Sequence, residues 1–421
     1  MPELEGSFRA PKGTNDLLPP GSIEWLGVTR LAFDTFARAG YEPIETPVFE
    51  HTEVFERGVG DATEVVGKQM YTFTDRGGRS LTLRPEGTAP VVRAVLEHGL
   101  DRSSLPVKLA YASPMFRQER PQKGRYRQFW QIGIEAIGSD VPVVDAEVIE
   151  LGARFLRDTG VVPKLLLNSI GHVAPDCRQS YLKVLSDFLR ANESKLAKED
   201  RDRVSTNPLR TFDSKESDTV AIMAEAPVIT DHLCDSCRDH FGAVQEILTD
   251  AQVDYELAPR LVRGLDYYTR TAFEFVAENL GAQDAVGGGG RYDGLSEALG
   301  GPHLPGIGFA LGTDRILLAR RPGEEVARSV EVFVVALGEA AGAEAFKIAT
   351  RLRRAGIGAD LDLAARSMKG QMKQADRSGA RWAAIVGEQE LATGRVTLKD
   401  LRTGDQREVA LGDLEKEVGA S

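Results

Sequence analysis

The spacing of hydrophobic and polar positions changes several times along the first hundred residues, and each change predicts an element. Over residues 22–40 the apolar residues recur at helical spacing and Gly40 supplies a stop, so this stretch predicts an amphipathic helix. Its apolar positions are Leu26, Leu31, Phe33 and Phe36. Residues 70–74 and 80–84 alternate as strands on either side of the turn sequence DRGG, which predicts a β-hairpin.

The next segments indicate an antiparallel sheet. Thr88 is suited to cap a helix that has Pro90 in its first turn and ends near Gly99. Residues 107–117 and 128–138 have strand patterns and are separated by the polar loop RQERPQKGRYR (117–127). Strands joined in this way pair antiparallel, which favours an α+β fold over a doubly wound one.

The middle of the chain predicts a helical insertion, and the end predicts a second domain. Residues 172–253 are charged and helical in pattern, after which strand patterns return at 270–277 and 306–312. A linker is expected at 320–325. Beyond it, strands at 331–337, 357–363 and 381–386 alternate with helices at 340–355 and 367–378, and a hairpin surrounds Thr403 and Gly404. This order is typical of a small parallel βαβαβ domain.

Composition excludes several classes of protein. The 421 residues are 42% hydrophobic and 27% charged, in the globular range. No apolar run is long enough to cross a membrane, the N-terminal segment does not resemble a signal peptide, and three cysteines exclude a disulfide scaffold. A cytoplasmic protein is expected. The net charge of −11 lies entirely in the first 330 residues, because the remainder carries 14 basic and 14 acidic side chains. The two parts are therefore expected to meet different partners.

Two segments in the first half carry candidate chemistry. Glu86 and Thr88, at a strand-to-helix turn, are suited to hold an ammonium group, although a helix cap plus a surface acid would have the same spacing. The loop 117–127 holds five basic residues and one acid, and arginines of this kind clamp phosphate, although a solvated hairpin tip is the alternative. Phe129, after the loop, is suited to stack a base. Gln131 and Glu135 then share one face of a strand with Gly133 between them, which leaves room for a ligand.

Three later segments add charge and glycine. In LVRGLDYYT (261–269), Arg263 is suited to neutralise charge at phosphorus and Tyr267 and Tyr268 to bind a ring nitrogen, although tyrosines at a strand start often only pack. Four consecutive glycines precede Tyr292 in GGGGRYD (287–293) and favour close approach of backbone to a ligand over a flexible surface loop. Arg315 follows an apolar strand near a helix start, which suits phosphate.

Two further features have ordinary explanations. Cys234 and Cys237 have CxxC spacing without a second pair, so we interpret them as ordinary thiols, although a zinc site with His232 or His240 is conceivable. Lys369, Lys373 and Arg377 follow one helix face at i, i+4 and i+8. Such a stripe is usually a solvated face, but in a neutral domain it also suits an RNA backbone.

In their order along the chain, these segments resemble class II aminoacyl-tRNA synthetases, and specifically the histidyl-tRNA synthetase family. FRQE (116–119) through Glu135 is similar to the second signature motif of the class, and residues 308–315 to the third. LVRGLDYYT and GGGGRYDGL (287–295) are similar to the two segments that distinguish the family, and APKGTND (10–16) to its N-terminal signature. The resemblance covers almost the whole chain.

The resemblance implies a fold and an activity. It implies a class II α+β catalytic domain at 1–325, built on an antiparallel sheet with an insertion at about 172–253, and a C-terminal α/β anticodon-binding domain at 331–421. Such enzymes activate L-histidine with ATP and Mg²⁺ as histidyl-adenylate and transfer it to the 3′ end of tRNA(His). They are expected to act as cytoplasmic homodimers.

The resemblance also assigns roles by position. Glu86, Thr88 and Gln131 would bind the α-amino group of histidine, Glu135, Tyr267 and Tyr268 would meet the imidazole, and Tyr292 would help to close that pocket. Gly87, Arg117 and Arg263 are also assigned to the histidine site. Catalysis would fall to Arg117, on the α-phosphate and the histidine carboxylate, and to Arg263, across that phosphate. ATP would be held by Arg117, Phe129 and Arg315. The acceptor end of the tRNA would meet Arg120 and Gln122. No bound metal of the protein's own is expected.

One residue departs from the family pattern, and three rival functions remain. The third motif commonly ends in Glu-Arg, whereas this chain has Asp314 and Arg315, so a metal or arginine contact of that acid is in question although activity should survive. A regulatory subunit of ATP phosphoribosyltransferase and a tRNA-sensing module share the fold but are expected to lose parts of LVRGLDYYT or the C-terminal domain, both present here. A synthetase for another amino acid would fit Glu135 and the tyrosines less well.

Overall fold

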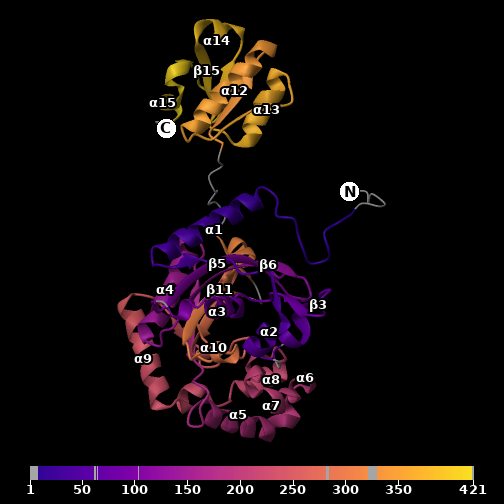
Figure 1. Ribbon diagram of the computed structural model, residues 1–421, viewed down its shortest axis with the longest axis vertical. Helices are drawn as coiled ribbons and strands as arrows, with labels where there is room; N and C mark the ends of the chain where they lie inside the picture. Colours follow the sequence, from indigo (N-terminus) through magenta and orange to yellow (C-terminus); the bar gives the residue numbers. More distant parts are fainter. Residues whose placement is uncertain are drawn as a thin grey trace. The chain divides into compact units, whose positions relative to one another are not determined.

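The chain folds into two units, Met1–Glu324 and Glu325–Ser421 (Figure 1). The computed structural model describes residues 8–60, 63, 65–102, 104–280, 284–320 and 330–419. Apart from Arg320, the expected linker at 320–325 lies outside the described residues.

The first unit is built on an eight-stranded sheet whose six central strands are antiparallel, which confirms the predicted α+β class. Only the short edge strands pair parallel with their neighbours. In spatial order the strands are β1 (Glu42–Pro43), β5 (Val107–Phe116), β6 (Gln128–Ile137), β11 (Gly306–Gly312), β10 (Ala285–Arg291), β9 (Thr269–Val276), β7 (Lys164–Ser169) and β8 (Glu256–Leu257).

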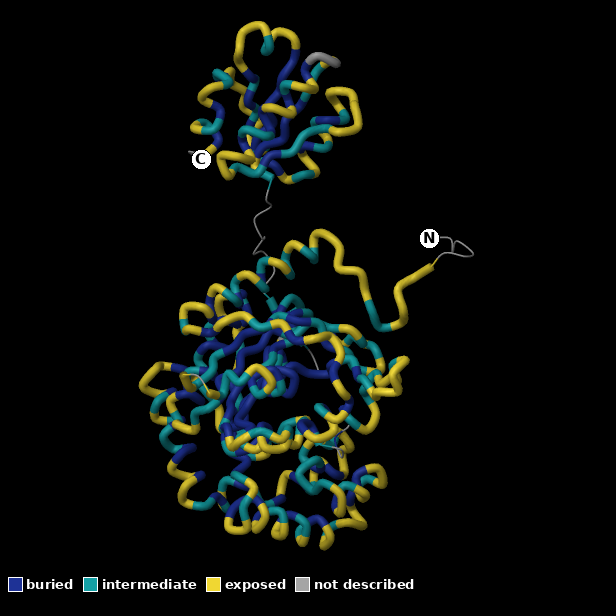
Figure 2. Tube along the Cα trace, in the orientation of Figure 1, coloured by how far each residue is buried: buried dark blue, intermediate teal, exposed yellow. Residues whose placement is uncertain are grey.

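Alternation along these strands gives the sheet an apolar face and a face that carries the candidate site. Ile132, Ile134, Phe273 and Phe309 point into the main core, whereas Gln131, Glu135 and Glu274 occupy the intervening positions. Four helices cover the apolar face, and their buried side chains complete the core (Figure 2). They are α1 (Gly21–Ala37), α4 (Pro142–Asp158), α9 (Asp235–Asp250) and α11 (Thr313–Ala319).

The first predicted helix exists as α1, but one of its assigned apolar positions is wrong. Its inner face consists of Val28, Ala32 and Phe36, whereas Leu26 is 40% exposed. Val28, Ala32 and Phe36 recur at every fourth residue and so form one stripe, whereas Leu26, two residues before Val28, is turned away from it.

The other face of the sheet carries short helices and a small sheet. Residues 70–74 and 80–84 form the predicted hairpin, with Thr74 opposite Ser80, and the turn is closed by Asp75, whose Oδ1 accepts the N–H groups of Gly77 and Arg79 at 2.8 and 2.9 Å. The sequence interpretation missed the third strand of this sheet. The elements are β2 (Phe49–His51), β3 (Tyr71–Thr74), β4 (Ser80–Leu83), α2 (Thr52–Val59), η1 (Val65–Gln69), α3 (Thr88–Glu97), η2 (Leu100–Arg102) and α10 (Leu295–Ala298).

The predicted insertion is helical, as expected. Its apolar core also includes residues 268 and 272, at the start of β9. Tyr268 and Ala272 pack into the same apolar cluster as Tyr181, Leu185 and Cys177. Its last helix, α9, places Cys237 in this cluster and Phe241, Val244 and Leu248 in the main core. The other elements of the insertion are α5 (Arg178–Asn192), η3 (Glu193–Lys195), α6 (Lys198–Arg201), α7 (Arg203–Thr206), η4 (Pro208–Asp213), α8 (Ser217–Met223) and η5 (Ile229–His232). A short 3₁₀ turn, η6 (Glu278–Leu280), follows β9.

The second unit has the predicted βαβαβ order followed by the predicted hairpin. Its sheet runs β13 (Ala359–Leu361), β12 (Val332–Ala336), β14 (Trp382–Val386), β15 (Arg395–Asp400) and β16 (Gln406–Ala410), the first three strands parallel and the last two antiparallel. Helix α12 (Glu339–Arg354) packs into one core and α13 (Met368–Ser378) into the other, so the two helices cover opposite faces of the sheet. The remaining elements are α14 (Glu388–Thr393), η7 (Leu411–Asp413) and α15 (Leu414–Gly419). Among the described residues, no helix has the length and apolar character to cross a bilayer.

Candidate active site

A cavity of about 580 Å³ lies on the face of the sheet opposite the main core. Nine of the residues singled out in the sequence line it: Glu86, Thr88, Arg117, Phe129, Gln131, Arg263, Tyr267, Tyr268 and Arg315. They come from four segments that lie far apart in the sequence, so the fold assembles what sequence order alone only implied. Gly87, Glu135 and Tyr292 do not line the cavity but lie behind its wall.

Helix α3 starts at the cavity, and its cap differs from the prediction. The carboxylate of Glu86 accepts the N–H groups of Thr88 and Ala89 at 2.8 and 2.9 Å. Thr88 is therefore not the cap, because its hydroxyl is turned toward the sheet. Glu86 is buried rather than a surface acid, and burial raises the pKa of its carboxyl group although the two backbone N–H groups lower it.

Glu135 is the centre of a buried hydroxyl network behind Thr88. Its two carboxylate oxygens accept hydrogen bonds from the hydroxyl groups of Tyr292 at 2.6 Å, Thr88 at 2.7 Å and Tyr111 at 3.3 Å. The side chain is fully buried, and burial raises the pKa of Glu135 to about 8, against the lowering effect of the Tyr292 and Thr88 hydrogen bonds. A carboxyl group with this pKa can change its protonation state when a polar ligand arrives beside it.

Two glycines, Gly308 on β11 and Gly87 just before α3, make room for this network. A Cβ atom at Gly308 would overlap the Glu135 carboxylate, and one at Gly87 would lie 2.7 Å from the Tyr111 ring. Because Gly87 has no side chain, α3 can begin directly against the Tyr111 ring. Gly87 therefore shapes the site without lining the cavity.

Two buried polar atoms of the cavity-lining side chains have no hydrogen-bond partner among the described residues, the acceptor Gln131 Oε1 and the donor Arg263 Nε. A buried acceptor without a donor is costly in the empty pocket and suits a ligand N–H group.

The two predicted catalytic arginines are held by different contacts. Arg117 donates from Nε to the carbonyl oxygen of Pro85 at 2.8 Å, and its guanidinium group lies 5.2 Å from the centre of the Phe129 ring. Arg263 forms an ion pair with Glu274 on β9 and lies 5.9 Å from the centre of the Tyr268 ring. Burial alone would lower the pKa of Arg263, but Glu274 raises it above its ordinary value, so the side chain stays cationic.

Arg315 lines the cavity beside Asp314, the residue at which the chain departs from the family's third motif. Its Nε donates to the carbonyl oxygen of Ala285 on β10. Asp314 also lines the cavity, where burial raises the pKa of its carboxyl group. The shorter acid therefore still faces the site.

Arg120 and Gln122 line a second hollow of about 340 Å³. It shares Glu119 and Arg125 with the main cavity, and these two side chains form an ion pair at 2.6 Å. The structure therefore separates the two residues expected to approach the tRNA from those expected to bind small substrates, with one ion pair between them.

The sequence interpretation missed several functional neighbours. Glu274 is an isolated acid in the apolar strand β9, and the sequence offered this signal. Tyr111 lies on the same face of the sheet as Glu135, to which its hydroxyl group donates. Arg210, Asp213 and Lys215 of the insertion also line the cavity. No local pattern marks these three, because only the folded insertion brings them to it.

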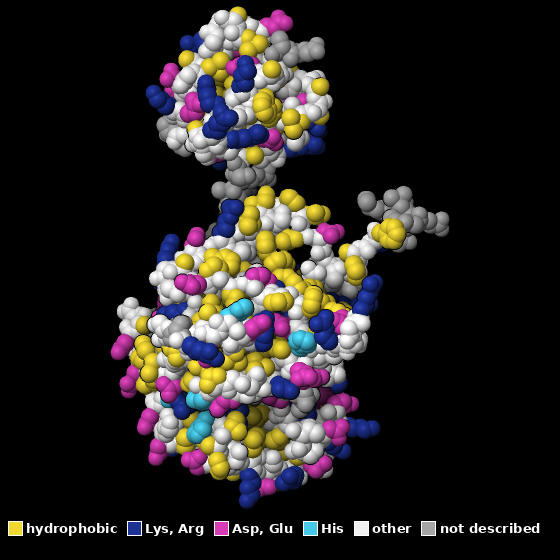
Figure 3. Space-filling model, in the orientation of Figure 1, with side chains coloured by type: hydrophobic (Ala, Val, Ile, Leu, Met, Phe, Trp, Pro, Cys, Tyr) yellow, Lys and Arg dark blue, Asp and Glu magenta, His cyan; other side chains and the backbone are white. Residues whose placement is uncertain are grey.

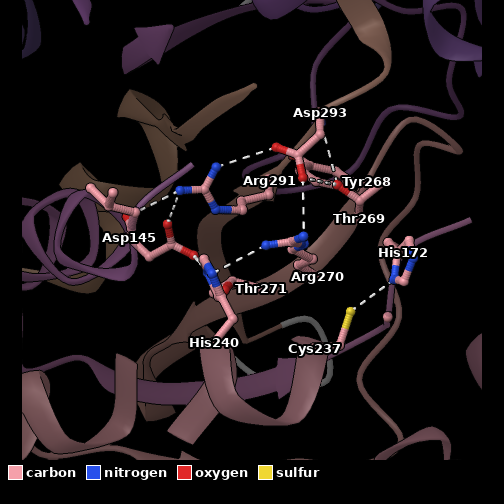
Figure 4. Close-up of polar contacts among 12 residues, drawn as sticks. Asp145, His172, Cys237, His240, Tyr268, Thr269, Arg270, Thr271, Arg291 and Asp293 are labelled. Atoms are coloured by element: carbon pink, nitrogen blue, oxygen red, sulfur yellow. Dashed lines mark hydrogen bonds and ion pairs between the residues drawn. The ribbon is translucent and has the colours of Figure 1, made fainter. Parts of the chain in front are cut away.

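A buried ion network fixes the glycine-rich strand behind the site (Figure 4). Arg291 and Asp145 form an ion pair at 2.6 Å with both side chains fully buried. Asp145 also accepts from Thr271 at 2.5 Å and lies 2.9 Å from His240 Nε2. His240 is thus a partner of Asp145 and not of the CxxC pair, and the His232 ring lies beside Tyr181. The contacts found for these two histidines are therefore with Asp145 and Tyr181 and not with the CxxC pair.

The antiparallel sheet, with its arginines and glycine-bearing strands around one cavity, defines the catalytic domain of a class II aminoacyl-tRNA synthetase. Two family models match the chain: histidyl-tRNA synthetase over residues 13–316 and anticodon binding domain over residues 331–420. The chain belongs to the histidyl-tRNA synthetase family.

Relatives and solved structures agree with this placement. A Halothermothrix orenii histidine–tRNA ligase is 48% identical, with 97% of this chain and 98% of the relative aligned, and one from Corynebacterium diphtheriae is 51% identical, with 98% and 97% aligned. The crystal structure of apo S. aureus histidyl-tRNA synthetase superposes with a TM-score of 0.80 at 37% identity, covering 98% of this chain and all of that one.

A regulatory relative has the same fold at lower similarity. A Bacillus halodurans structure, described as an ATP phosphoribosyltransferase regulatory subunit/histidyl-tRNA synthetase, has a TM-score of 0.66 at 23% identity and covers 90% of this chain and 98% of that one. This likeness concerns the fold alone. The ligases are about half identical over their full length, so the regulatory function is not favoured.

Proposed function

We propose that this protein is a histidine–tRNA ligase, which forms histidyl-adenylate from L-histidine and ATP and transfers histidine to tRNA(His). The observation that carries this proposal is one cavity lined both by buried acids and hydroxyl groups and by five arginines, Arg117, Arg125, Arg210, Arg263 and Arg315. Its dimensions suit an amino acid joined to a nucleotide, and we assign the acids and hydroxyl groups to one end of this ligand and the arginines to the other.

The polar end is suited to histidine. The α-amino group is placed against Glu86, Gln131 and Thr88, where Gln131 Oε1 still needs a donor. The imidazole is placed against the rings of Tyr267 and Tyr268, which pack on each other with centres 4.6 Å apart, and Glu135 and Tyr292 lie behind them. An apolar side chain would leave these polar groups unpaired, at a discrimination on the order of 10⁴-fold. No editing domain is then needed.

The arginine end is suited to phosphate. A histidine carboxylate oxygen attacks the α-phosphorus, the bond to the bridging oxygen breaks, and pyrophosphate leaves. The carboxylate is already a nucleophile, so the protein contributes orientation and charge neutralisation. Arg117 and Arg263 are placed on the α-phosphate from two sides, Arg315 on the tail phosphates, and Phe129 on the adenine.

ATP is taken as its Mg²⁺ complex. Asp284 and Asp314 line the cavity beside Arg315, and carboxylate oxygens are the ligands that Mg²⁺ prefers. These two residues would hold the ion, which neutralises phosphate charge when bound. We further propose that the protein acts in the cytoplasm as a homodimer, as its family membership suggests, and that Arg120 and Gln122 contact the acceptor end of the tRNA.

The first test is ATP–pyrophosphate exchange with each of the twenty amino acids. Exchange is expected with histidine alone, because only its ring pairs with the buried acid and tyrosines. If folded protein shows no exchange with any of the twenty amino acids, the ligase proposal is wrong. If it shows exchange with an amino acid other than histidine, the pocket is misassigned.

For the second unit we propose that the stripe on α13 contacts the anticodon arm. Lys369, Lys373 and Arg377 are all exposed on one face of the helix. Changing all three to Glu is expected to raise the KM for tRNA and to lower the dependence of log kcat/KM on log salt concentration by about one unit per lost phosphate contact. Pyrophosphate exchange, which needs no tRNA, should be unchanged.

A matched control is available on the opposite face of the same sheet. Lys347, Arg354 and Lys416 are exposed on α12 and α15, and Figure 3 shows basic side chains over α12. Their triple change to Glu alters the net charge equally. If this control raises the KM for tRNA and the α13 variant does not, α12 rather than α13 carries the contact.

A further inference from the structure

Three cysteines and a histidine of the insertion converge at one point beside the catalytic segment. His172 follows β7, Cys177 immediately precedes α5, Cys234 immediately precedes α9, and Cys237 lies in the first turn of α9. Their ligand atoms all lie within 4.8 Å of one another. Cys234 and Cys237 therefore do have two further candidate ligands beside them, His172 and Cys177. The sequence spacing did not indicate these two because they lie about sixty residues earlier in the chain.

The distances within the cluster match a tetrahedral metal site. His172 Nδ1 lies 3.0 Å from Cys237 Sγ and 3.7 Å from Cys234 Sγ, and Figure 4 shows the Cys237 sulfur directed at the His172 ring. Zn–S and Zn–N bonds of about 2.3 and 2.0 Å at tetrahedral angles place two sulfurs ~3.8 Å apart and a sulfur and a nitrogen ~3.6 Å apart. A change of about 0.6 Å in the His172–Cys237 distance, and of at most about 1.2 Å in any other, would bring the cluster to these values.

The surroundings favour thiolates and close approach. Two helix N-termini, those of α5 and α9, point their positive ends at Cys177 and at the CxxC pair, which stabilises negative sulfur. Cys177 and Cys237 are buried, at 0% and 1% exposed. Gly171 has φ +63°, and a Cβ there would lie 2.8 Å from Cys177 Sγ, so the backbone is wrapped tightly around the sulfur.

We propose that His172, Cys177, Cys234 and Cys237 bind one Zn²⁺ in a closed, structural Cys₃His site. Four soft or borderline ligands in a tetrahedral arrangement select zinc over Mg²⁺ or Ca²⁺, and four protein ligands leave no open position for catalysis. The site joins the start of α5 to the start of α9 and so closes the insertion into a loop.

The cluster is mechanically connected to the histidine pocket. Arg178, the residue after Cys177, donates to the carbonyl oxygens of Ile170 at 2.9 Å, Gly171 at 2.9 Å and Tyr268 at 2.6 Å. The metal would therefore fix the segment that holds the main chain of Tyr268. This makes the four ligands positioning residues for the pocket, and the metal assignment itself does not depend on the identity of the substrate.

The test is the metal content of the full chain, purified without a metal-binding tag under reducing conditions and dialysed against metal-free buffer. About one zinc per chain is expected by mass spectrometry of the elements. Cys177→Ser and Cys237→Ser should lose it, whereas His232→Asn, the histidine that sequence spacing brings near the CxxC pair, should keep it. Wild-type protein that holds no zinc and takes up none after incubation with Zn²⁺ would overturn the proposal.

A second measurement uses wild-type protein, so it tests the proposal even if the cysteine variants do not fold. In wild-type protein, titration of the thiols with a mercurial should release zinc in step with thiol modification, detected with a chromogenic chelator. Replacement by Co²⁺ should give the intense visible bands of a tetrahedral thiolate complex. If the mass of the protein is instead lower by two hydrogens, no zinc is bound and the CxxC thiols do not react with the mercurial, the two cysteines form a disulfide and the metal site is contradicted.

Chelation should also act on the pocket. Removal of zinc is expected to lower the melting temperature and raise the KM for histidine more than the KM for ATP, with recovery on adding Zn²⁺ but not Mg²⁺. Unchanged stability and KM after complete zinc removal would show that the ion has no structural role.

Discussion

Replacing Arg263 by Gln is expected to lower kcat for histidine-dependent pyrophosphate exchange by about 10²–10³-fold, while the KM for histidine changes by about twofold at most. The guanidinium group lines the cavity and remains cationic because Glu274 pairs with it. Its charge is needed when negative charge concentrates on the α-phosphate in the transition state, whereas histidine binds chiefly through the other end of the cavity.

Glu274 offers a graded version of the same experiment. Glu274→Gln keeps Arg263 but removes its ionic partner, so a smaller fall in kcat is expected than for Arg263→Gln. The double variant should be little worse than Arg263→Gln alone, because Glu274 then has nothing left to position.

Arg260→Gln is the matched control. Arg260 lies in the same segment, but it donates to the carbonyl oxygens of Met223 and Ala224 in the insertion and does not line the cavity. Its variant should exchange pyrophosphate at the wild-type rate. An Arg263→Gln enzyme with a normal kcat would contradict the assignment of transition-state stabilisation to this side chain.

The fold was largely predictable because each element has a strong local pattern. Alternation over 107–117 and 128–138 specified two paired strands, and the βαβαβ order of the second unit follows from runs of apolar residues between amphipathic helices. Short edge strands such as β1 and β2 were missed because two or three residues carry no period. Leu26 was misplaced because the buried stripe of α1 depends on how the helix is rotated against the sheet, which the helix pattern alone does not specify.

The site was predictable only as far as its residues lie in recognisable segments. Nine residues singled out from sequence do meet in one cavity, but their depth was not visible, so Glu135 and Tyr292 were expected at its surface and lie behind it. Long-range pairing was missed for the same reason. Glu274 meets Arg263, and His172 meets Cys237 across 65 residues, through tertiary contacts that leave no spacing signal.

Glu135→Gln is expected to raise the KM for histidine by about 10- to 100-fold, with a smaller effect on kcat. In the wild-type network the Tyr292 and Thr88 hydroxyls both donate to the carboxyl group. The carboxyl group can accept both bonds even when it is neutral, because its hydroxyl oxygen keeps a lone pair, whereas the NH₂ group of an amide only donates. One hydroxyl would therefore face a donor and must turn away or lose its partner, at a cost of about 1–3 kcal/mol. An unaltered KM would show that this network does not shape the histidine pocket.

The same variant makes the stability of the protein less dependent on pH. An unfolded glutamate ionises near pH 4.3, whereas Glu135 in the folded chain does so at about 8, so between these values the folded state keeps a proton that the unfolded state has lost. The contribution of Glu135 to the free energy of unfolding therefore falls as the pH rises through this window, by about 1.4 kcal/mol per pH unit, and is constant above it. Urea unfolding at pH 5.5, 7 and 8.5 should show wild type losing stability relative to Glu135→Gln, whereas the exposed control Glu193→Gln should follow wild type at all three values. A constant difference between wild type and Glu135→Gln would mean that Glu135 ionises in the folded protein near its ordinary pKa, and that the buried network stabilises the carboxylate rather than the neutral acid.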